Sequence, residues 1–280
     1  MWIQYKIKKE SCMYMKKKSL MAANVLLAAA LLCGCAPQAG KTDAPSQTTA
    51  VTEAAQPTAD AAASAFSWQD TPTHNAFRRT LKTIHDTLRL PAITNMDRIS
   101  LWEPGTIEDE TFAVTDVDGD GEEELLVGIS NTTMAGMCKV VYGYDEEKDD
   151  VREEALTWFS ATFYPEMIRI EASHNHGYAG DVLWPYTVKR YDREKDAYQD
   201  TYYVDAWSRE LAEYDSLLER DYPEEIDTEN EGFVYLITEN GETKILNRRD
   251  FEKWESALFA GLEPLEINWM KMTPENIGLQ

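Results

Sequence analysis

The residues with the most specific chemistry lie in the stretch TDVDGDGEEELLV. Three aspartates, Asp116, Asp118 and Asp120, occupy alternate positions, and Glu124 follows four residues later. Carboxylates this close repel one another, so we expect a cation to lie among them. Calcium takes about six to eight oxygen ligands, and Gly121 permits the sharp turn that aims alternate side chains inward. The spacing therefore predicts a loop that holds a divalent cation.

The residues that follow decide between two kinds of calcium loop. Counted from Asp116, an EF-hand would place a bidentate glutamate at position 12 and would be flanked by helices. That position is Val127, inside an apolar run with strand character. We therefore expect a tight loop between two strands. An acidic turn without an ion remains the alternative, and magnesium fits less well because it prefers fewer protein ligands and keeps its waters.

Residues 112–128 resemble the calcium loop of FG-GAP and VCBS-type repeats, D-x-D-G-D-G-x-x-D/E followed by apolar residues. The resemblance covers a small part of the chain, and the loop occurs once. It implies a structural Ca²⁺ bound at loop positions 1, 3, 5, 7 and 9. Those ligands would be Asp116, Asp118, Asp120, the backbone carbonyl of Glu122, and Glu124. Glutamate instead of aspartate at position 9 departs from the pattern and would lengthen that contact.

The N-terminal residues predict where the protein is located. Residues 15–20, MKKKSL, are basic, and residues 21–32 form an apolar run that is shorter than the roughly 20 residues of a membrane-spanning helix. The run ends in LCGC, which resembles the bacterial lipobox. That resemblance implies cleavage after Gly34 and acylation of Cys35, by chains such as palmitate. Residues 1–35 would then be a lipoprotein signal peptide, with Met15 a better start than Met1, and the mature protein would be extracytoplasmic and anchored to the cell membrane.

The composition changes twice after Cys35. Residues 36–66 are rich in Ala, Thr, Ser, Pro and Gln, so we expect a disordered tether. Residues 67–280 can build a sizeable core and are expected to form the folded module. Without the first 35 residues, the chain has 21 basic and 49 acidic residues, a formal charge of −28. A surface this acidic makes nucleic acid a poor partner.

The periodicity of the module predicts hairpins between helices. Residues 74–90 carry the apolar stripe of an amphipathic helix that Pro91 would end, and Asn247 can cap a second helix that Gly261 would close. A short turn is expected at residues 273–277. The expected strands are 111–117, 123–130, 138–145, 151–159, 182–192, 197–207, 232–238 and 242–247. We therefore predict the α+β class, with an antiparallel hairpin-rich sheet, an N-terminal amphipathic helix and C-terminal helices.

Two of the expected turns have similar sequences. YDEEKDD at residues 144–150 and YDREKDA at residues 191–197 lie 47 positions apart. A blade-type repeat would have such a period, but the flanking strands do not match. We favour two charged turns of similar chemistry over an internal duplication.

Three other features have chemical potential. His174 and His176, with Asp181 nearby, could chelate a metal on a strand, although their neighbours indicate a solvated turn. Seven aromatic residues could form a platform for sugars, although core packing is the more common role of such residues. They are Trp184, Tyr186, Tyr191, Tyr198, Tyr202, Tyr203 and Trp207. Cys138 begins an apolar run, which favours a buried thiol over a nucleophile.

These features together predict a non-enzymatic surface lipoprotein with a structural calcium site. The chain resembles surface lipoproteins of Gram-positive bacteria, a likeness that does not supply a function. No catalytic residues are assigned, and the ligand of a binding module would be a glycan or a peptide. The alternative is an exported hydrolase that acts on glycan or peptide through a pair of carboxylates. A solute receptor of a transporter is less favoured because the sequence lacks a βαβ rhythm.

Overall fold

The computed structural model describes residues 66–93, 99–101, 106–172, 177, 182–212 and 221–279. The predicted signal peptide, nearly all of the predicted tether, and the residues His174, His176 and Asp181 lie outside this part of the chain.

Within these ranges, no helix combines the length and the apolar character needed to cross a bilayer.

The first sheet has five antiparallel strands in the order β11-β1-β2-β3-β4. Its strands are β1 (Thr111–Thr115), β2 (Glu124–Ile129), β3 (Cys138–Asp145), β4 (Asp150–Trp158) and β11 (Met270–Lys271). Two short 3₁₀ turns, Thr106–Asp109 and Met134–Gly136, precede β1 and β3 in the sequence. Strand β2 is buried along its whole length, which explains its nearly continuous apolar sequence.

The second sheet has six antiparallel strands in the order β10-β9-β8-β7-β6-β5. Its strands are β5 (Thr162–Tyr164), β6 (Met167–Glu171), β7 (Tyr186–Asp192), β8 (Ala197–Ser208), β9 (Phe233–Glu239) and β10 (Glu242–Leu246). The short helix α3 (Arg209–Ala212) follows β8. Asn240 and Gly241 both have positive φ in the β9–β10 turn, as a two-residue Asn-Gly hairpin turn requires.

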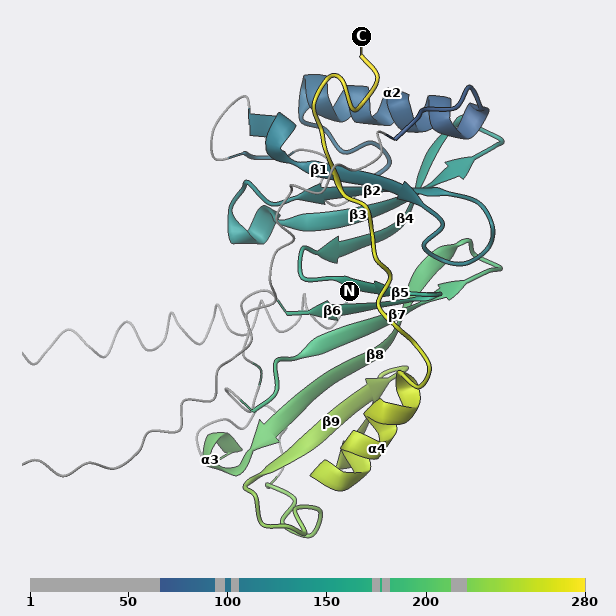
Figure 1. Ribbon diagram of the computed structural model, residues 1–280. Coiled ribbons are helices and arrows are strands. Elements are labelled where there is room, and N and C mark those ends of the chain that lie inside the picture. Colours follow the sequence, from purple (N-terminus) through teal and green to yellow (C-terminus); the bar gives the residue numbers. More distant parts are fainter. Residues whose placement is uncertain are drawn as a thin grey trace, which may run out of the picture. The chain divides into compact units, whose positions relative to one another are not determined.

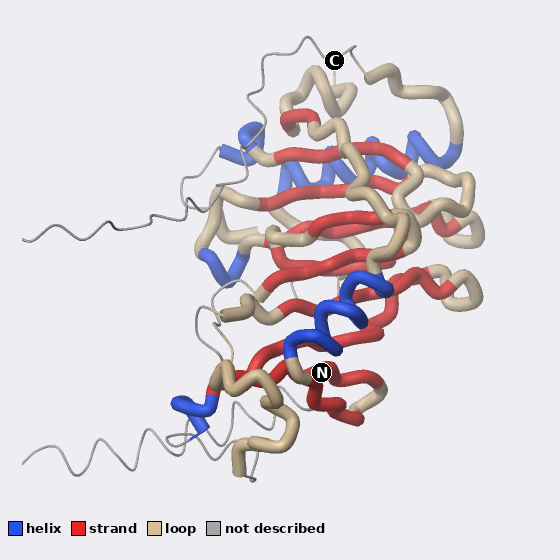
Figure 2. Tube along the Cα trace, turned by 60° about the horizontal axis from the view of Figure 1, so that its bottom comes forward, coloured by secondary structure: helices blue, strands red, loops and turns tan. Residues whose placement is uncertain are grey.

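One helix lies against each sheet (Figure 1). Helix α2 (Pro72–Thr87) buries Phe77, Leu81 and Ile84 in a core shared with the first sheet. Helix α4 (Arg248–Leu258) contributes its buried Phe251 to a core shared with the second sheet. Figure 2 shows α4 lying across the strands of that sheet.

A third core joins the two sheets. Strands β1 to β4 contribute Ala113, Leu126, Val141 and Ala155, and the loop after β1 contributes Val117. The other sheet and its leading turn contribute Ala161, Phe163, Ile168, Ile170 and Tyr198. Because this core packs the two sheets together, loops at the ends of strands from different sheets can contact one another.

Each predicted strand and helix overlaps an observed element, but the prediction omits the strands β5, β6 and β11. Three further differences concern the fold class and the ends of the helices. The strands outnumber the helices and form two sheets, so the described part of the chain is mostly β, with one helix near its N-terminal end and one in its C-terminal part. The first helix ends at Thr87 because Leu88 adopts the left-handed conformation, at φ 55°, before Pro91 is reached. The second helix ends at Leu258, and Gly261, at φ 74°, lies in the turn that follows.

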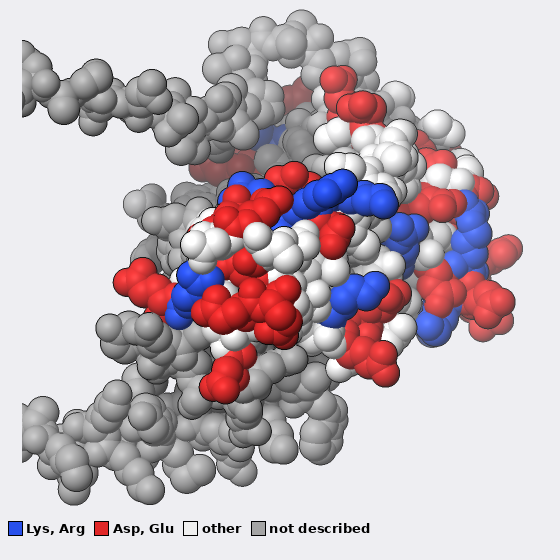
Figure 3. Space-filling view, turned by 90° about the horizontal axis from the view of Figure 1, so that it is seen from below, with Lys and Arg blue, Asp and Glu red and all other residues white. Residues whose placement is uncertain are grey.

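The acidic composition is visible on the surface. Figure 3 shows one face of the molecule, on which Asp and Glu side chains lie among Lys and Arg side chains. Several acidic side chains are instead buried, among them Asp118, Glu124 and Glu154. Buried carboxylates need partners or protons, so these three define the place to look for a site.

Candidate metal site

The acidic loop closes the β1–β2 hairpin. Thr115 pairs with Glu124 at the ends of the two strands, so the loop contains Asp116 to Glu123. Its two glycines, Gly119 and Gly121, have φ of 76° and 100°, a conformation that residues with a Cβ rarely adopt. Glycine is thus required for the tight curl that the sequence predicts.

The backbone of the loop wraps around its own carboxylates. Asp116 accepts hydrogen bonds from the amides of Gly119 at 2.7 Å and Gly121 at 3.2 Å. Asp118 Oδ1 accepts from the amide of Asp120 at 3.0 Å. Asp120 Oδ1 in turn accepts from the amide of Glu122 at 2.8 Å. These bonds hold the side chains of the three aspartates against the backbone of the loop.

Three carboxylates converge in the loop. One oxygen from each of Asp116, Asp118 and Glu124 lies within 4.8 Å of the others. Calcium binds oxygens at about 2.3–2.6 Å, so two ligands on opposite sides of one ion are separated by about this distance. The spacing of the three oxygens therefore suits a divalent cation.

The central carboxylate of this group is incompletely satisfied. Asp118 is 0 % exposed, and its Oδ2 atom is buried without a hydrogen-bond partner. Glu124 is also buried, and its Oε2 accepts the amide of Val117 at 2.8 Å. A buried, unpaired carboxylate oxygen is costly in a protein interior unless a proton or a cation neutralises it.

The charges of these groups are perturbed accordingly. Burial raises the pKa of Asp118 to about 6, and the neighbouring Asp120 and Asp116 add to the shift. Burial raises the pKa of Glu124 to about 9, and Asp118 and Glu154 raise it further. Glu154, on β4, has a pKa raised by burial to about 8, although Arg152 opposes the shift. Without a cation, the cluster retains protons at neutral pH.

A second group of carboxylates involves the other sheet. One oxygen from each of Asp118, Asp120 and Asp196 lies within 4.8 Å of the others. Asp196 belongs to the turn between β7 and β8, and Asp118 is shared by both groups. No sequence motif singles out Asp196 as a ligand. The similarity of its turn to residues 144–150 was the only signal near it.

The β7–β8 hairpin contacts the acidic loop at several points, and the two lie side by side at one edge of the molecule in Figure 1. The hydroxyl of Tyr191 lies 3.4 Å from Asp120 Oδ2, and the hydroxyl of Tyr198 donates to the carbonyl of Val117 at 3.2 Å. Arg193 Nη2 donates to the carbonyl of Gly119 at 3.3 Å. The loop is therefore packed against the second sheet.

Two of the predicted ligands are more exposed than the others. Asp120 lies at the surface within the second group, and Asp116 is exposed within the first. Glu122 has an exposed side chain, consistent with a role for its backbone only, and the use of its carbonyl stays a prediction.

The predicted aromatic platform is divided between several environments. Tyr186, Tyr198 and Trp207 are buried, and Tyr202 packs edge-on against Trp254 of α4. Among the seven aromatics, Trp184 and Tyr203 have the largest exposure, 36 % and 40 %. Core and cross-strand packing therefore account for most of the aromatic residues in this stretch.

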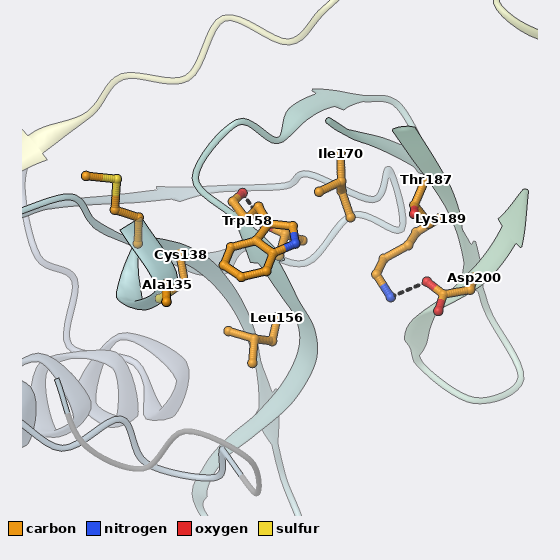
Figure 4. A pocket seen from close by; sticks show the side chains of 10 residues that line it. Ala135, Cys138, Leu156, Trp158, Ile170, Thr187, Lys189 and Asp200 are labelled. Carbon is orange, nitrogen blue, oxygen red and sulfur yellow. Dashed lines mark hydrogen bonds and ion pairs between the residues drawn. The ribbon is translucent and has the colours of Figure 1, made fainter. Parts of the chain in front are cut away.

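A cavity of about 300 Å³ lies where the two sheets meet, and none of its lining residues belongs to the acidic loop (Figure 4). It is lined by Ala135, Met137, Cys138, Leu156, Thr157, Trp158, Ile170, Thr187, Lys189 and Asp200. Asp200 forms an ion pair with Lys189 at 2.6 Å. Cys138 is buried, as predicted, and burial raises the pKa of its thiol to about 12, so the reactive thiolate is scarce at neutral pH.

Comparisons of the chain with models of protein families, with curated proteins and with solved structures found no match. The likeness of residues 112–128 to a calcium loop thus remains a local resemblance. The geometry of the carboxylates described above is the evidence for the site.

Proposed function

We propose that this protein is an extracytoplasmic lipoprotein, anchored to the membrane through Cys35, whose α+β module is stabilised by one structural Ca²⁺. The observation that carries the calcium site is the buried, unpaired Oδ2 of Asp118 at the centre of converging carboxylates. The anchor rests on the LCGC motif and the basic and apolar segments that precede it.

The choice of calcium follows from the ligands available. The loop offers several carboxylates at once, and calcium accepts a flexible set of six to eight oxygens. Magnesium demands near-octahedral geometry and usually keeps several waters, so it uses fewer protein ligands. A buried carboxylate such as Asp118 therefore fits calcium better.

The expected affinity favours a structural role. Extracellular calcium modules have dissociation constants of about 10⁻⁴–10⁻³ M, which at roughly 1 mM free calcium gives about 0.4–1.4 kcal/mol of stabilisation. A site of this affinity is about 50–90 % occupied at roughly 1 mM calcium, which suits a modest structural role. The ion would hold the loop closed and relieve the repulsion among its carboxylates.

We favour a binding role over hydrolysis. The cavity between the sheets has one carboxylate, Asp200, and it is already ion-paired with Lys189. A glycosidase needs two carboxyl groups facing each other at about 5–10 Å. The protein would display its module on the tether and contact a glycan, a peptide or another envelope component.

Thermal unfolding of the full chain tests the calcium site. We expect calcium to raise the melting temperature of the wild type and chelator to reverse the effect. Asp118→Asn should abolish the response, whereas the control Glu225→Gln, which removes one exposed negative charge elsewhere, should keep it. An identical melting temperature of the wild type with calcium and with chelator would refute the site.

Membrane fractionation tests the anchor. Cys35→Ser should move the protein from the membrane fraction to the soluble fraction, because the acyl chains could no longer be attached. Retention of the variant in the membrane would contradict lipidation at this cysteine.

A further inference from the structure

We propose that Asp196, from the β7–β8 turn of the second sheet, completes the cation site of the β1–β2 loop, so that one ion ties the two sheets together. This inference rests on the proposed calcium site and extends it beyond the loop. None of the sequence features of residues 112–128 implies a ligand from another hairpin.

The geometry brings Asp196 to the incomplete part of the loop. Oxygens of Asp118, Asp120 and Asp196 lie within 4.8 Å of one another, which matches the separation of ligands around one divalent ion. An independent observation also points to a missing partner, because Asp118 is fully buried and its Oδ2 makes no hydrogen bond. A cation bound at Asp118 would lie among the oxygens of both hairpins.

Neighbouring side chains hold Asp196 in place. The hydroxyl of Tyr191 donates to Asp196 Oδ1 at 2.5 Å, and Arg152 forms an ion pair with Asp196 Oδ2. Arg152 also pairs with the buried Glu154 at 2.8 Å, so its position is fixed from two sides. An ionised carboxylate has about four acceptor positions, and two such contacts leave room for an ion.

The surrounding contacts suit a joint site that acts as a structural clamp. The hairpin that carries Asp196 already touches the loop through Tyr191, Arg193 and Tyr198. These contacts are polar and lie at the edge of the core that joins the sheets. An ion shared between Asp118 and Asp196 would add a strong link where the loop and the hairpin otherwise meet through single hydrogen bonds.

The chain contains a matched turn without such a site. Asp149, between β3 and β4, has the same φ of 51° as Asp196 and accepts a hydrogen bond from Tyr144 at 3.1 Å, as Asp196 does from Tyr191. Among the described residues, the groups of carboxylates that could hold an ion do not include Asp149. The two turns therefore differ mainly in that Asp196 lies beside the carboxylates of the acidic loop and Asp149 does not.

The experiment compares Asp196→Gly with Asp149→Gly in the full chain. Glycine adopts the left-handed conformation without strain, so each variant removes one carboxylate and keeps its turn. Tb³⁺ serves as the probe: its luminescence titration gives affinity, and its lifetimes in H₂O and D₂O give the number of bound waters. Calcium competition then gives the affinity for Ca²⁺ itself.

We expect Asp196→Gly to weaken calcium binding by at least about tenfold. It should also add about one water to the bound Tb³⁺, because an empty ligand position is filled by solvent. Asp149→Gly should change neither quantity. Asp196→Asn keeps an acceptor for Tyr191 and guards against misfolding of the glycine variant; it should weaken binding by removing one negative charge.

The outcomes separate this inference from the proposed function. A wild-type protein that binds neither Ca²⁺ nor Tb³⁺ would refute both. If the wild type binds the ions, the same hydration number and affinity for Asp196→Gly as for the wild type would refute the role of Asp196 alone. A weaker affinity without an added water would also refute it, because Asp196 would then act on the ion only at a distance.

Discussion

The backbone amide of Val117 donates a 2.8 Å hydrogen bond to Oε2 of Glu124 across the two ends of the acidic loop. This bond brings the carboxylate that directly follows the loop back to the position where the first turn of the loop begins. Glu124 therefore has a backbone partner in addition to the proposed cation. The two roles of Glu124, closing the loop and the proposed binding of a cation, can therefore be separated.

Glu124→Gln should weaken calcium binding by about tenfold or more while leaving the metal-free protein about as stable as the wild type. Burial raises the pKa of Glu124 to about 9, so its carboxyl is protonated in the metal-free protein at neutral pH. Glutamine has nearly the same shape and charge as that protonated form, and its carbonyl can accept the Val117 amide. Calorimetric titration with calcium and urea unfolding in chelator measure the two quantities.

Glu122→Gln is the matched control for this experiment. Glu122 has an exposed side chain and is expected to offer its backbone carbonyl only, so its affinity for calcium should stay close to that of the wild type. Weakening equal to that of Glu124→Gln would mean that calcium responds to the total charge of the loop. The assignment of individual ligands would then be wrong.

The metal-free protein should lose stability as the pH rises from about 5 to about 8. The pKa of Glu154 is raised from 4.5 to about 8, mainly by burial, so the folded state retains a proton that the unfolded state releases. Stability is then greatest below the unfolded pKa and falls as the pH rises through the folded one. Urea unfolding in chelator at several pH values measures this slope.

Glu154→Gln should reduce this slope, because glutamine carries no titrating proton. Saturating calcium should also make the decline with pH shallower, since the cation replaces protons in the cluster. A metal-free wild type with constant stability between pH 5 and pH 8 would contradict the buried, protonated carboxylates.

The local part of the site could be predicted from sequence because its information is local. Alternating aspartates and the glycines Gly119 and Gly121 specify a curl whose candidate ligands follow from their spacing alone. The positions of Asp116, Asp118 and Glu124 in one group agree with that expectation. Asp196 could not be found in this way, because its place beside the loop depends on how two sheets pack.

The fold shows the same division between local and long-range information. The alternating apolar residues of the strands and the helix cap at Asn247 could be predicted from neighbouring residues. The side chain of Asn247 accepts the Asp250 amide at 2.9 Å. The pairing of β11 with β1 could not be predicted in this way, because Met270 and Lys271 form only a two-residue strand. Met270 pairs with Phe112, which lies far away in the sequence, and no local pattern indicates that contact.

The titration of Lys139 should make the protein more stable as the pH rises from about 8 to about 10. Burial lowers the pKa of Lys139 from 10.5 to about 8, and its ammonium group lies over the rings of Phe159, Phe163 and Trp269. In this window the unfolded state binds the proton more tightly, so raising the pH favours the folded state. Unfolding at pH 8 and pH 10 measures the change.

Lys139→Met should remove this increase, because methionine fills a similar space and has no proton to lose. The variant also loses the hydrogen bond from the ammonium to the carbonyl of Ala161 at 2.8 Å, which affects stability at every pH. The comparison is therefore between slopes. Equal slopes for the two proteins would show that Lys139 titrates near its ordinary pKa.

Outside the proposed metal site, Asp227 should be among the carboxylates whose substitution lowers the unfolding free energy most. It is buried and accepts the amides of Glu231 at 2.8 Å and Gly232 at 2.9 Å, together with Arg209 at 2.9 Å. Burial alone would raise the pKa of Asp227, but the two backbone hydrogen bonds, Tyr222 and Arg209 lower it overall. The folded state therefore favours the ionised form, which organises the segment that leads into β9.

Asp227→Asn should cost about 1–3 kcal/mol of unfolding free energy, because the amide group of asparagine turns a donor toward donors that previously shared a carboxylate. Glu224→Gln is the control: Glu224 also pairs with Arg209, at 2.6 Å, but its side chain is 63 % exposed. An exposed ion pair contributes about 0–1 kcal/mol, so this control should change little. Urea unfolding of both variants gives the two values, and equal losses would contradict the view that Asp227 stabilises this segment through its buried hydrogen bonds.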